Sequence, residues 1–313
     1  MIIKYRKIWF SLSGAAVLAS LLSFTLIGLN LGIDFTGGSL LEVEFSVTRP
    51  SVNSVSQVLS SAGIENATIQ PVEDDKMIMR FKDVNEETHQ QILAALEKEF
   101  QAQLNLEGGE GMGIVIETGK AVKEIRFDSI GPSIGQELKE KTIWSIVIVL
   151  IAIILYVAWA FRKVSKPVAS WKYGLIAVVA LFHDIIITVG IFALLGKFYG
   201  IEVNAPFVAS LLTILGYSVN DTIVVFDRTR ENLVKHLGEN FEEIVQESIN
   251  QVIVRSINAS FTTLIVLFAI LLLGGSTLRD FVLALIIGIS VGTYSSIFVA
   301  SPLLVTWEKF RNR

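Results

Sequence analysis

The sequence contains no cysteine among its 313 residues. Disulfide bonds, thiolate metal sites and cysteine nucleophiles are therefore excluded. Histidine is also scarce, because His89, His183 and His236 are widely separated and match no metal-binding spacing. No P-loop, G-x-S-x-G or H-E-x-x-H pattern occurs either. We therefore predict that the chain is not an enzyme and has no cofactor and no metal site.

Charged residues are also few, at 18%, whereas 52% of the residues are hydrophobic and the mean hydropathy is +0.59. Soluble domains are less apolar than this on average. The charges are unevenly distributed. Residues 30–140 carry 19 acidic and 9 basic side chains, while the remaining residues carry 11 acidic and 17 basic side chains. This asymmetry indicates an acidic soluble domain inserted into a basic and apolar part of the chain.

Six apolar windows are long enough, or nearly so, to cross a membrane as helices of about 20 residues. They are Ile8–Leu29, Thr142–Phe161, Gly174–Leu195, Ala205–Phe226, Ser256–Leu273 and Phe281–Thr306. The first is too long for a signal peptide and lacks a small-residue cleavage site before Asp34, so we interpret it as an anchor. We predict a first transmembrane helix over residues 1–30, a soluble domain over 31–140, and a five-helix bundle over 141–313 with a loop at about 227–254.

Lysine and arginine predict the orientation of these spans. The basic residues gather in the N-terminus, in the loops after the second and fourth spans, and in the C-terminal tail. They are Lys4, Arg6, Lys7, Arg162, Lys163, Lys166, Lys172, Arg228, Arg230, Lys235, Lys309, Arg311 and Arg313. Because short basic loops stay in the cytoplasm, both termini are predicted to be cytoplasmic and residues 30–140 to lie on the opposite side.

Periodicity in the soluble part predicts the order β-α-β-β-α-β. The predicted strands are Leu40–Val47, two in a hairpin over Thr68–Phe81 that turns at residues 73–75, Ile114–Thr118 and a short Lys123–Asp128; the predicted helices are Val52–Ala62 and Asn85–Leu104. This order is typical of a split βαβ, ferredoxin-like domain. The predicted fold class is an α-helical membrane protein with six transmembrane helices and an inserted α+β ferredoxin-like domain.

Three ionisable residues fall inside or at the edge of the predicted spans. Asp184 is near the middle of the third span, Asp221 is nearer the cytoplasmic end of the fourth, and Arg255 directly precedes the fifth window. Each such group costs roughly 2.5–3.5 kcal/mol to insert, so it is a functional hypothesis by default. For Asp184 a structural reading is equally open, with Thr188 one turn away as its hydrogen-bond partner. His183 is expected to point elsewhere and to pack.

Polar residues form one helical face on the fourth span and another on the fifth. The faces are Ser210, Thr213, Tyr217, Asn220 and Asp221, and then Arg255, Asn258 and Thr262. We expect the two faces to meet inside the bundle and to bring Asp221 close to Arg255. Such a pair acts either as a proton switch or as a static link between helices.

Small residues recur every four positions on two spans, which allows helices to approach closely. These residues are Ser11, Ala15, Ala19 and Ser23 on the first span, and Gly288, Gly292, Ser296 and Ala300 on the last. This pattern indicates helix packing within the chain, or packing against a partner subunit.

Six segments of the chain together form a recognisable set of motifs: LGIDFTGG at 31–38, GPSIG at 131–135, His183-Asp184, LGYSVNDTIVVFDR at 215–228, RSINAS at 255–260 and GTYSSIF at 292–298. These segments resemble those of the SecF family of protein-export membrane proteins. The first two are similar to signatures that SecD and SecF share, and they contain Asp34, Gly37, Gly38, Gly131 and Gly135. The long fourth segment is similar to SecF specifically. Asp34 with its glycines is equally compatible with a plain turn.

The resemblance implies membership of the resistance–nodulation–division superfamily, in which two six-span halves use proton flow to move periplasmic domains. It implies a subunit of the Sec protein-export machinery. With SecD, this subunit uses the proton gradient to drive late-stage translocation of secreted proteins. The implied location is the bacterial cytoplasmic (inner) membrane, with residues 30–140 periplasmic. The implied partners are a separate SecD-like subunit, the Sec translocation channel, an unfolded secreted polypeptide as client and the lipid bilayer, with no nucleic acid.

The resemblance also implies site residues. In the family, the aspartate of the span-four signature and the arginine at the start of span five are implicated in proton use, and these positions match Asp221 and Arg255. We expect Asn220 and Tyr217 to shape their surroundings, and we keep Asp184 as a further candidate for proton coupling.

Three other functions stay open. Half of a small-molecule exporter is one, although a single small loop leaves little room for a drug pocket. An intramembrane aspartyl protease is another, because Asp184 and Asp221 lie on separate spans, although their sequence contexts differ from the Tyr-Asp and Gly-x-Gly-Asp of those proteases. The third is a scaffold that organises a translocation channel without using protons.

Overall fold

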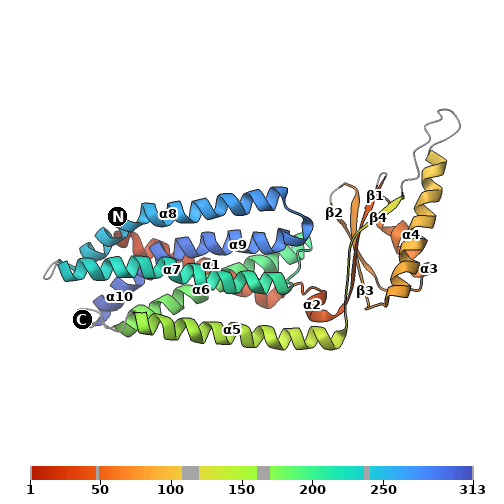
Figure 1. The fold of residues 1–313 in the computed structure, drawn as a ribbon. Helices are drawn as coiled ribbons and strands as arrows, with labels where there is room; N and C mark the ends of the chain where they lie inside the picture. The colour runs from red at the N-terminus through yellow and green to blue at the C-terminus, as the bar shows by residue number, and fades with distance from the viewer. Residues whose placement is uncertain are drawn as a thin grey trace. The chain divides into compact units, whose positions relative to one another are not determined.

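The computed structural model describes residues 2–46, 49–72, 74–107, 120–160, 170–235 and 240–311. The chain forms two compact units (Figure 1). One contains residues 1–30 and 142–313, and the other contains residues 31–141. The predicted strand Ile114–Thr118, the turn residue Glu73, His236 and most of the loop after the second span lie outside the described residues.

The helical unit contains the six predicted spans, each of which is long and apolar enough to cross a membrane. The first is α1 (Arg6–Ile27), preceded by the short turn η1 (Ile3–Tyr5). The next four are α5 (Pro132–Ala160), α6 (Ser170–Tyr199), α7 (Ala205–Lys235) and α8 (Phe241–Leu273). The last span is α9 (Ser276–Ser295), a π-helical turn η2 (Ser296–Ala300) and α10 (Ser301–Arg311).

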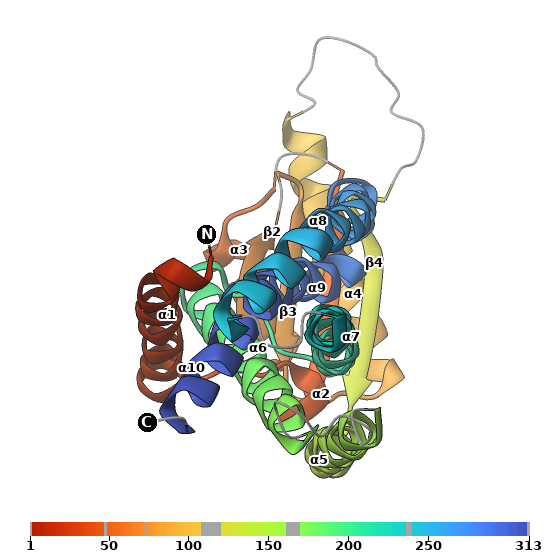
Figure 2. The same ribbon diagram turned by 90° about the vertical axis from the view of Figure 1, so that its left-hand side faces the viewer.

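The spans divide into an inner and an outer group. About half or more of the apolar window is buried in α6 (56%), α7 (50%) and the last span (61%), but only 11% in α1, 6% in α5 and 17% in α8. α1 packs on α6, and both α7 and α8 pack on α9. Figure 2, which looks towards the ends of the helices, shows α1 and α5 on different sides of α6. The inner group therefore positions any buried polar site, and the outer helices expose mostly apolar side chains to their surroundings.

Several helices are longer than their apolar windows. α5 begins at Pro132, which is favoured at the first helical position because its missing N–H would have no partner there. α8 begins at Phe241 and is capped by Asn240, whose side chain accepts a hydrogen bond from Glu242 N–H at 3.1 Å. Arg255 is therefore inside α8, as the apolar spacing upstream of its window permits.

The inserted unit has a four-stranded antiparallel sheet in the order β2-β3-β1-β4. The strands are β1 (Gly38–Phe45), β2 (Thr68–Val72), β3 (Lys76–Phe81) and β4 (Val122–Ile130). The helices α3 (Val52–Ser61) and α4 (Glu86–Glu107) pack on it. This is the ferredoxin-like order that the sequence predicts. Leu41, Val43, Met77, Met79, Leu59 and Ile92 are among the fully buried core residues.

A short helix, α2 (Ile33–Thr36), was not predicted. It is followed by β1. Compared with the predicted strand Leu40–Val47, β1 starts two residues earlier and also ends two residues earlier. Gly37 (φ 72°) and Gly38 (φ 127°) join the two elements in backbone conformations that other residues rarely adopt.

Candidate functional site: buried carboxylates in the spans

Asp184 on α6 is enclosed by hydrogen-bond donors from three helices. Its side chain is 1% exposed. Ser218 on α7 donates to its Oδ2 at 2.5 Å, Ser295 on α9 donates to the same oxygen at 2.9 Å, and His183 Nδ1 lies 2.9 Å from Oδ1. Buried polar groups are costly unless they are paired, so these donors explain how α6 carries a carboxyl group at this depth.

Two details of this arrangement correct the sequence analysis. Thr188 does not contact the Asp184 carboxyl group, because its hydroxyl donates to the Asp184 backbone carbonyl at 2.8 Å. His183 does not point elsewhere, since it is 7% exposed and lies within hydrogen-bond distance of Asp184. Both contacts lie within α6: the Thr188 hydroxyl bonds to the backbone one turn earlier, and the His183 ring folds back onto the adjacent carboxyl group, so spacing along the helix did not show which atoms meet.

Asp221 on α7 has a different set of neighbours. It is 8% exposed, and its Oδ2 accepts a hydrogen bond from Ser296 at 3.0 Å. No other side-chain hydrogen bond to its carboxyl group is found within the parts of the chain that the structure describes. The preceding residue, Asn220, is exposed. Asp221 therefore lies at the edge of the packed interior, whereas Asp184 lies within it.

The last span links the two carboxyl groups through consecutive serines. Ser295 contacts Asp184, and Ser296 contacts Asp221. Both serines are fully buried at the junction between α9 and the π-helical turn η2. In a regular helix, neighbouring residues point about 100° apart, so one short segment serves α6 and α7 at once. π-helical turns occur frequently at functional sites.

Glycines bring α9 close enough for these contacts. A Cβ atom at Gly292 would lie 3.0 Å from Ser218 Cβ and 3.4 Å from Asp184 Oδ2. At Gly288 it would lie 2.2 Å from Ile214 Cδ1 on α7. The predicted small-residue face of the last span therefore packs inside the chain. The predicted face of α1 does not, because Ser11, Ala15 and Ala19 are exposed.

The structure does not form the predicted ion pair between Asp221 and Arg255. On α8, the predicted polar residues Arg255, Asn258 and Thr262 are all exposed. Among the described residues, the Arg255 guanidinium group is not within ion-pair distance of the Asp221 carboxyl group. α8 instead buries Ser256 and Ser260 against its neighbours. The side of a helix that faces the core is set by packing, which the polar pattern alone does not determine.

The two glycine-containing segments meet within the inserted unit. A Cβ atom at Gly37 would lie 2.8 Å from Pro132 Cα, and one at Gly135 would lie 3.0 Å from the Gly37 nitrogen and 3.4 Å from the Asp34 carbonyl oxygen. These contacts seat α2 against the start of α5, and they explain why glycine is needed on both segments. Gly131 has open space around it.

Comparison with known proteins was informative over almost the whole chain. Residues 113–310 match the family "Protein export membrane protein SecD/SecF, C-terminal", and residues 22–48 match the "SecD/SecF GG Motif" family. The Protein translocase subunit SecF of Thermobaculum terrenum is 39% identical, with 98% of this chain and 93% of the relative covered. That of Anaerolinea thermophila is 35% identical, with 97% and 92% covered. The chain belongs to the SecF family.

A solved structure of SecDF from Thermus thermophilus, a translocon-associated membrane protein, supports the same assignment. It is similar to this SecF-family chain with a TM-score of 0.76 and 33% identity over 99% of the chain. The chain spans only 38% of that longer SecDF protein. The SecD/SecF family models cover both glycine-containing segments and all three intramembrane ionisable residues.

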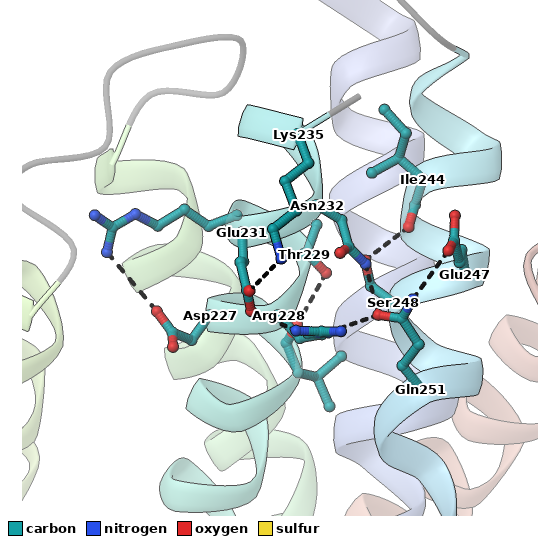
Figure 3. Close-up of polar contacts among 12 residues, drawn as sticks. Asp227, Arg228, Thr229, Glu231, Asn232, Lys235, Ile244, Glu247, Ser248 and Gln251 are labelled. Carbon is teal, nitrogen blue, oxygen red and sulfur yellow. Dashed lines mark hydrogen bonds and ion pairs between the residues drawn. The ribbon is translucent and has the colours of Figure 1, made fainter. Parts of the chain in front are cut away.

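Polar contacts between α7 and α8 fix how these two helices of the SecF-family chain align. Arg228 Nε donates to Gln251 Oε1 at 2.5 Å, and Asn232 Nδ2 donates to Ser248 and Gln251 at 2.9 Å each (Figure 3). Further into the span, Tyr217 donates to Ser260 at 3.3 Å. These contacts join the C-terminal half of α7 to the N-terminal half of α8 at several levels.

This alignment gives the relative depth of Asp221 and Arg255. Arg228 lies opposite Gln251. Arg228 is seven residues after Asp221 on α7, and Gln251 is four residues before Arg255 on α8. Because the two helices are antiparallel neighbours, counting four residues along each from the Arg228–Gln251 contact places Arg255 nearly opposite Val224. An offset of three residues corresponds to about 4.5 Å along the helix axis. The two groups are therefore at similar depth, although the arginine points outwards.

Proposed function

We propose that this chain is a subunit of the Sec protein-export machinery that, with a SecD-like subunit, uses the proton gradient to drive late-stage translocation of secreted proteins. Family membership supports the role in export. The observation that supports proton coupling is the buried Asp221, which has one neutral hydrogen-bond donor and an arginine at similar depth. Intramembrane carboxylates with this kind of neighbour typically mark proton pathways.

The exposed face of α8 supports a membrane partner. Arg255, Asn258 and Thr262 form a polar stripe on α8, while Asn220 and Thr213 are exposed on the adjoining helix α7. Polar groups at this depth are unfavourable against lipid. A second helical bundle that covers the stripe would shield these polar groups from lipid. It would also offer a carboxyl group or carbonyl groups as hydrogen-bond acceptors to Arg255. A SecD-like subunit fits this place, because the SecDF protein continues well beyond the part that this chain resembles.

The proposed mechanism uses the outward position of Arg255. In this proposal the Asp221 carboxyl group exchanges the proton, and Arg255, at a similar depth on α8, is the cation that moves towards it and away from it.

The proposed setting is the bacterial cytoplasmic membrane, with both termini cytoplasmic and residues 30–140 periplasmic. The distribution of lysine and arginine supports this orientation. Its partners would be SecD, the Sec channel and an unfolded secreted polypeptide. We also propose that the chain has no catalytic activity. The enclosure of Asp184 by three donors supports this, since a protease would need both aspartates open to a peptide.

The experiment uses vesicles that contain the chain, a SecD-like partner and the Sec channel. Release of a secreted substrate at a late stage is measured with and without an imposed pH gradient. Asp221→Asn should reduce the gradient-dependent part at least tenfold, because the amide cannot exchange a proton. Arg255→Lys should also reduce it, since lysine keeps the charge but loses the planar fork of donors.

Asp227→Asn is the matched control, because Asp227 is exposed on the same helix six residues further on. It should keep the full response. If Asp221→Asn keeps full gradient-dependent release while Asp184→Asn loses it, Asp184 is the proton-coupling residue instead. If neither variant changes release, the chain is a scaffold and proton coupling through it is refuted.

A further inference from the structure

A basic cavity lies between the first and last helices of the bundle, at the end where both chain termini lie. It has a volume of about 470 Å³ and is lined by Arg6, Lys7 and Phe10 of α1, and by Thr306, Lys309 and Phe310 of α10. Figure 2 shows these two helices next to each other at this end. None of these residues belongs to the intramembrane site of Asp184 and Asp221, so the cavity needs a separate explanation.

The charges around the cavity do not cancel. Glu242 of α8 is the carboxylate that contacts its lining, with Oε1 at 3.1 Å from Arg6 and 3.0 Å from Lys309. Lys7 is exposed, and it forms no ion pair within the described residues. Three cations and one carboxylate leave an excess of two positive charges beside the cavity. An anion would neutralise this excess, and Lys7 is the cation with no carboxylate already beside it.

The position of the cavity along the span identifies the kind of anion. Arg6 and Lys7 are at the start of α1, just outside its apolar window, where a membrane has its headgroup layer. Phe10 lies one turn further along, about 6 Å deeper towards the hydrocarbon. Phe310 follows Lys309 at the C-terminal end of α10 and is 74% exposed. The cavity is therefore cationic at headgroup level and has one aromatic side chain, Phe10, on its bilayer side, which matches a phosphate with attached acyl chains.

We propose that this cavity binds the phosphate headgroup of an anionic phospholipid in the leaflet next to the chain termini. Arg6, Lys7 and Lys309 contact the phosphate, and Phe10 packs against the first part of an acyl chain. Basic pockets between transmembrane helices are known to hold anionic headgroups. Bound in this way, the lipid would tie α1 to α10, and through Glu242 also to α8. The proposal does not depend on whether Asp221 carries protons.

Native mass spectrometry of the delipidated full chain in detergent tests the proposal. The chain is titrated with phosphatidylglycerol and, separately, with phosphatidylcholine. We expect one phosphatidylglycerol to bind in preference to phosphatidylcholine. Lys7→Gln should weaken phosphatidylglycerol binding about fivefold, which corresponds to roughly 1 kcal/mol for one cation near anionic lipid. Because Lys7 has no carboxylate beside it, this substitution breaks no contact that the fold needs.

Lys4→Gln is the matched control. Lys4 is also exposed and only three residues away, but it does not line the cavity. It should change the affinity less than twofold. Equal weakening by Lys4→Gln and Lys7→Gln would show general attraction to a basic surface and overturn the proposal. Equal binding of phosphatidylglycerol and phosphatidylcholine would also overturn it.

A further comparison separates a lipid from free phosphate. Inorganic phosphate at millimolar concentration should not displace phosphatidylglycerol, and Phe10→Ala should weaken lipid binding two- to threefold. If inorganic phosphate displaces the lipid fully and Phe10→Ala has no effect, the cavity is a site for small anions and the lipid assignment is wrong.

Discussion

Asp184 and Asp221 are both buried on neighbouring inner spans, and each accepts a hydrogen bond from a serine of the last span. Their surroundings nevertheless differ. Asp184 has donors from α6, α7 and α9, whereas Asp221 has Ser296 and lies beside the exposed Asn220. The difference shows that burial alone does not assign a role. A carboxyl group with several side-chain contacts joins more of the bundle than one with a single contact.

The largest expected effect is on stability when the Asp184 carboxyl group is removed. Asp184→Ala removes the acceptor of two interhelical hydrogen bonds, from Ser218 and Ser295, and such bonds in membranes contribute about 0.6 kcal/mol each. We expect the free energy of unfolding to fall by about 1.2 kcal/mol. Asp221→Ala removes the acceptor of one donor and should cost about 0.6 kcal/mol. Denaturant titration of both variants in mixed micelles measures the difference. Equal losses would remove the distinction between the two sites.

The second effect concerns the close approach of α9 to α7 beside Asp184. Gly292→Ala places a methyl group 3.0 Å from Ser218 Cβ, which is closer than most such contacts and requires Ser218 to move by a few tenths of an ångström. We expect a loss of about 1 kcal/mol, at the low end for overpacked cores. Gly216→Ala on α7 is the control, because no atom lies within 4 Å of its added Cβ. It should be neutral or raise thermal stability, since alanine favours helices. A destabilising Gly216→Ala with a neutral Gly292→Ala would contradict the packing.

The smallest effect compares the consecutive serines directly. Ser295→Ala leaves Asp184 with Ser218 and His183, whereas Ser296→Ala removes the one side-chain donor that the described residues give Asp221. Each should lower stability by about 0.6 kcal/mol. Only Ser296→Ala should lower gradient-dependent release in vesicles, by about two- to threefold. A larger loss with Ser295→Ala would move the proton-coupling role to Asp184.

Much of the fold follows from local patterns. The six spans could be predicted because about 20 apolar residues in a row have few other places to be buried. The hairpin at residues 68–81 could be predicted because its strands alternate around an acidic turn. The helix Ile33–Thr36 was missed, because four residues before two glycines carry no periodic signal.

The candidate site could be predicted only in part. Asp184, Asp221 and Arg255 stand out because charge is rare in a span. Ser218 and Ser295 did not stand out, because serine is common and nearly neutral in spans, and its role depends on which helix faces it. The outward direction of Arg255 could not be predicted either, since it follows from the buried serines on the other side of α8. Two adjacent serines in an apolar span, as at 295–296, were the available signal.

The π-helical turn η2 also determines in which directions the side chains before and after it point around the axis of the last span. Ser301 Oγ bonds to the Ser296 carbonyl five residues back, and Lys172 on α6 forms a buried ion pair at 3.1 Å with Glu308 on α10. The wider turn adds one residue relative to a continuous α-helix, and each residue turns the helix by about 100°. The wide turn therefore lets Ser295 and Ser296 face the carboxyl groups while Glu308 faces Lys172. Deleting one of residues 297–300 would leave Ser295, Ser296, Lys172 and Glu308 chemically intact, yet it would rotate one of these contacts away from its partner.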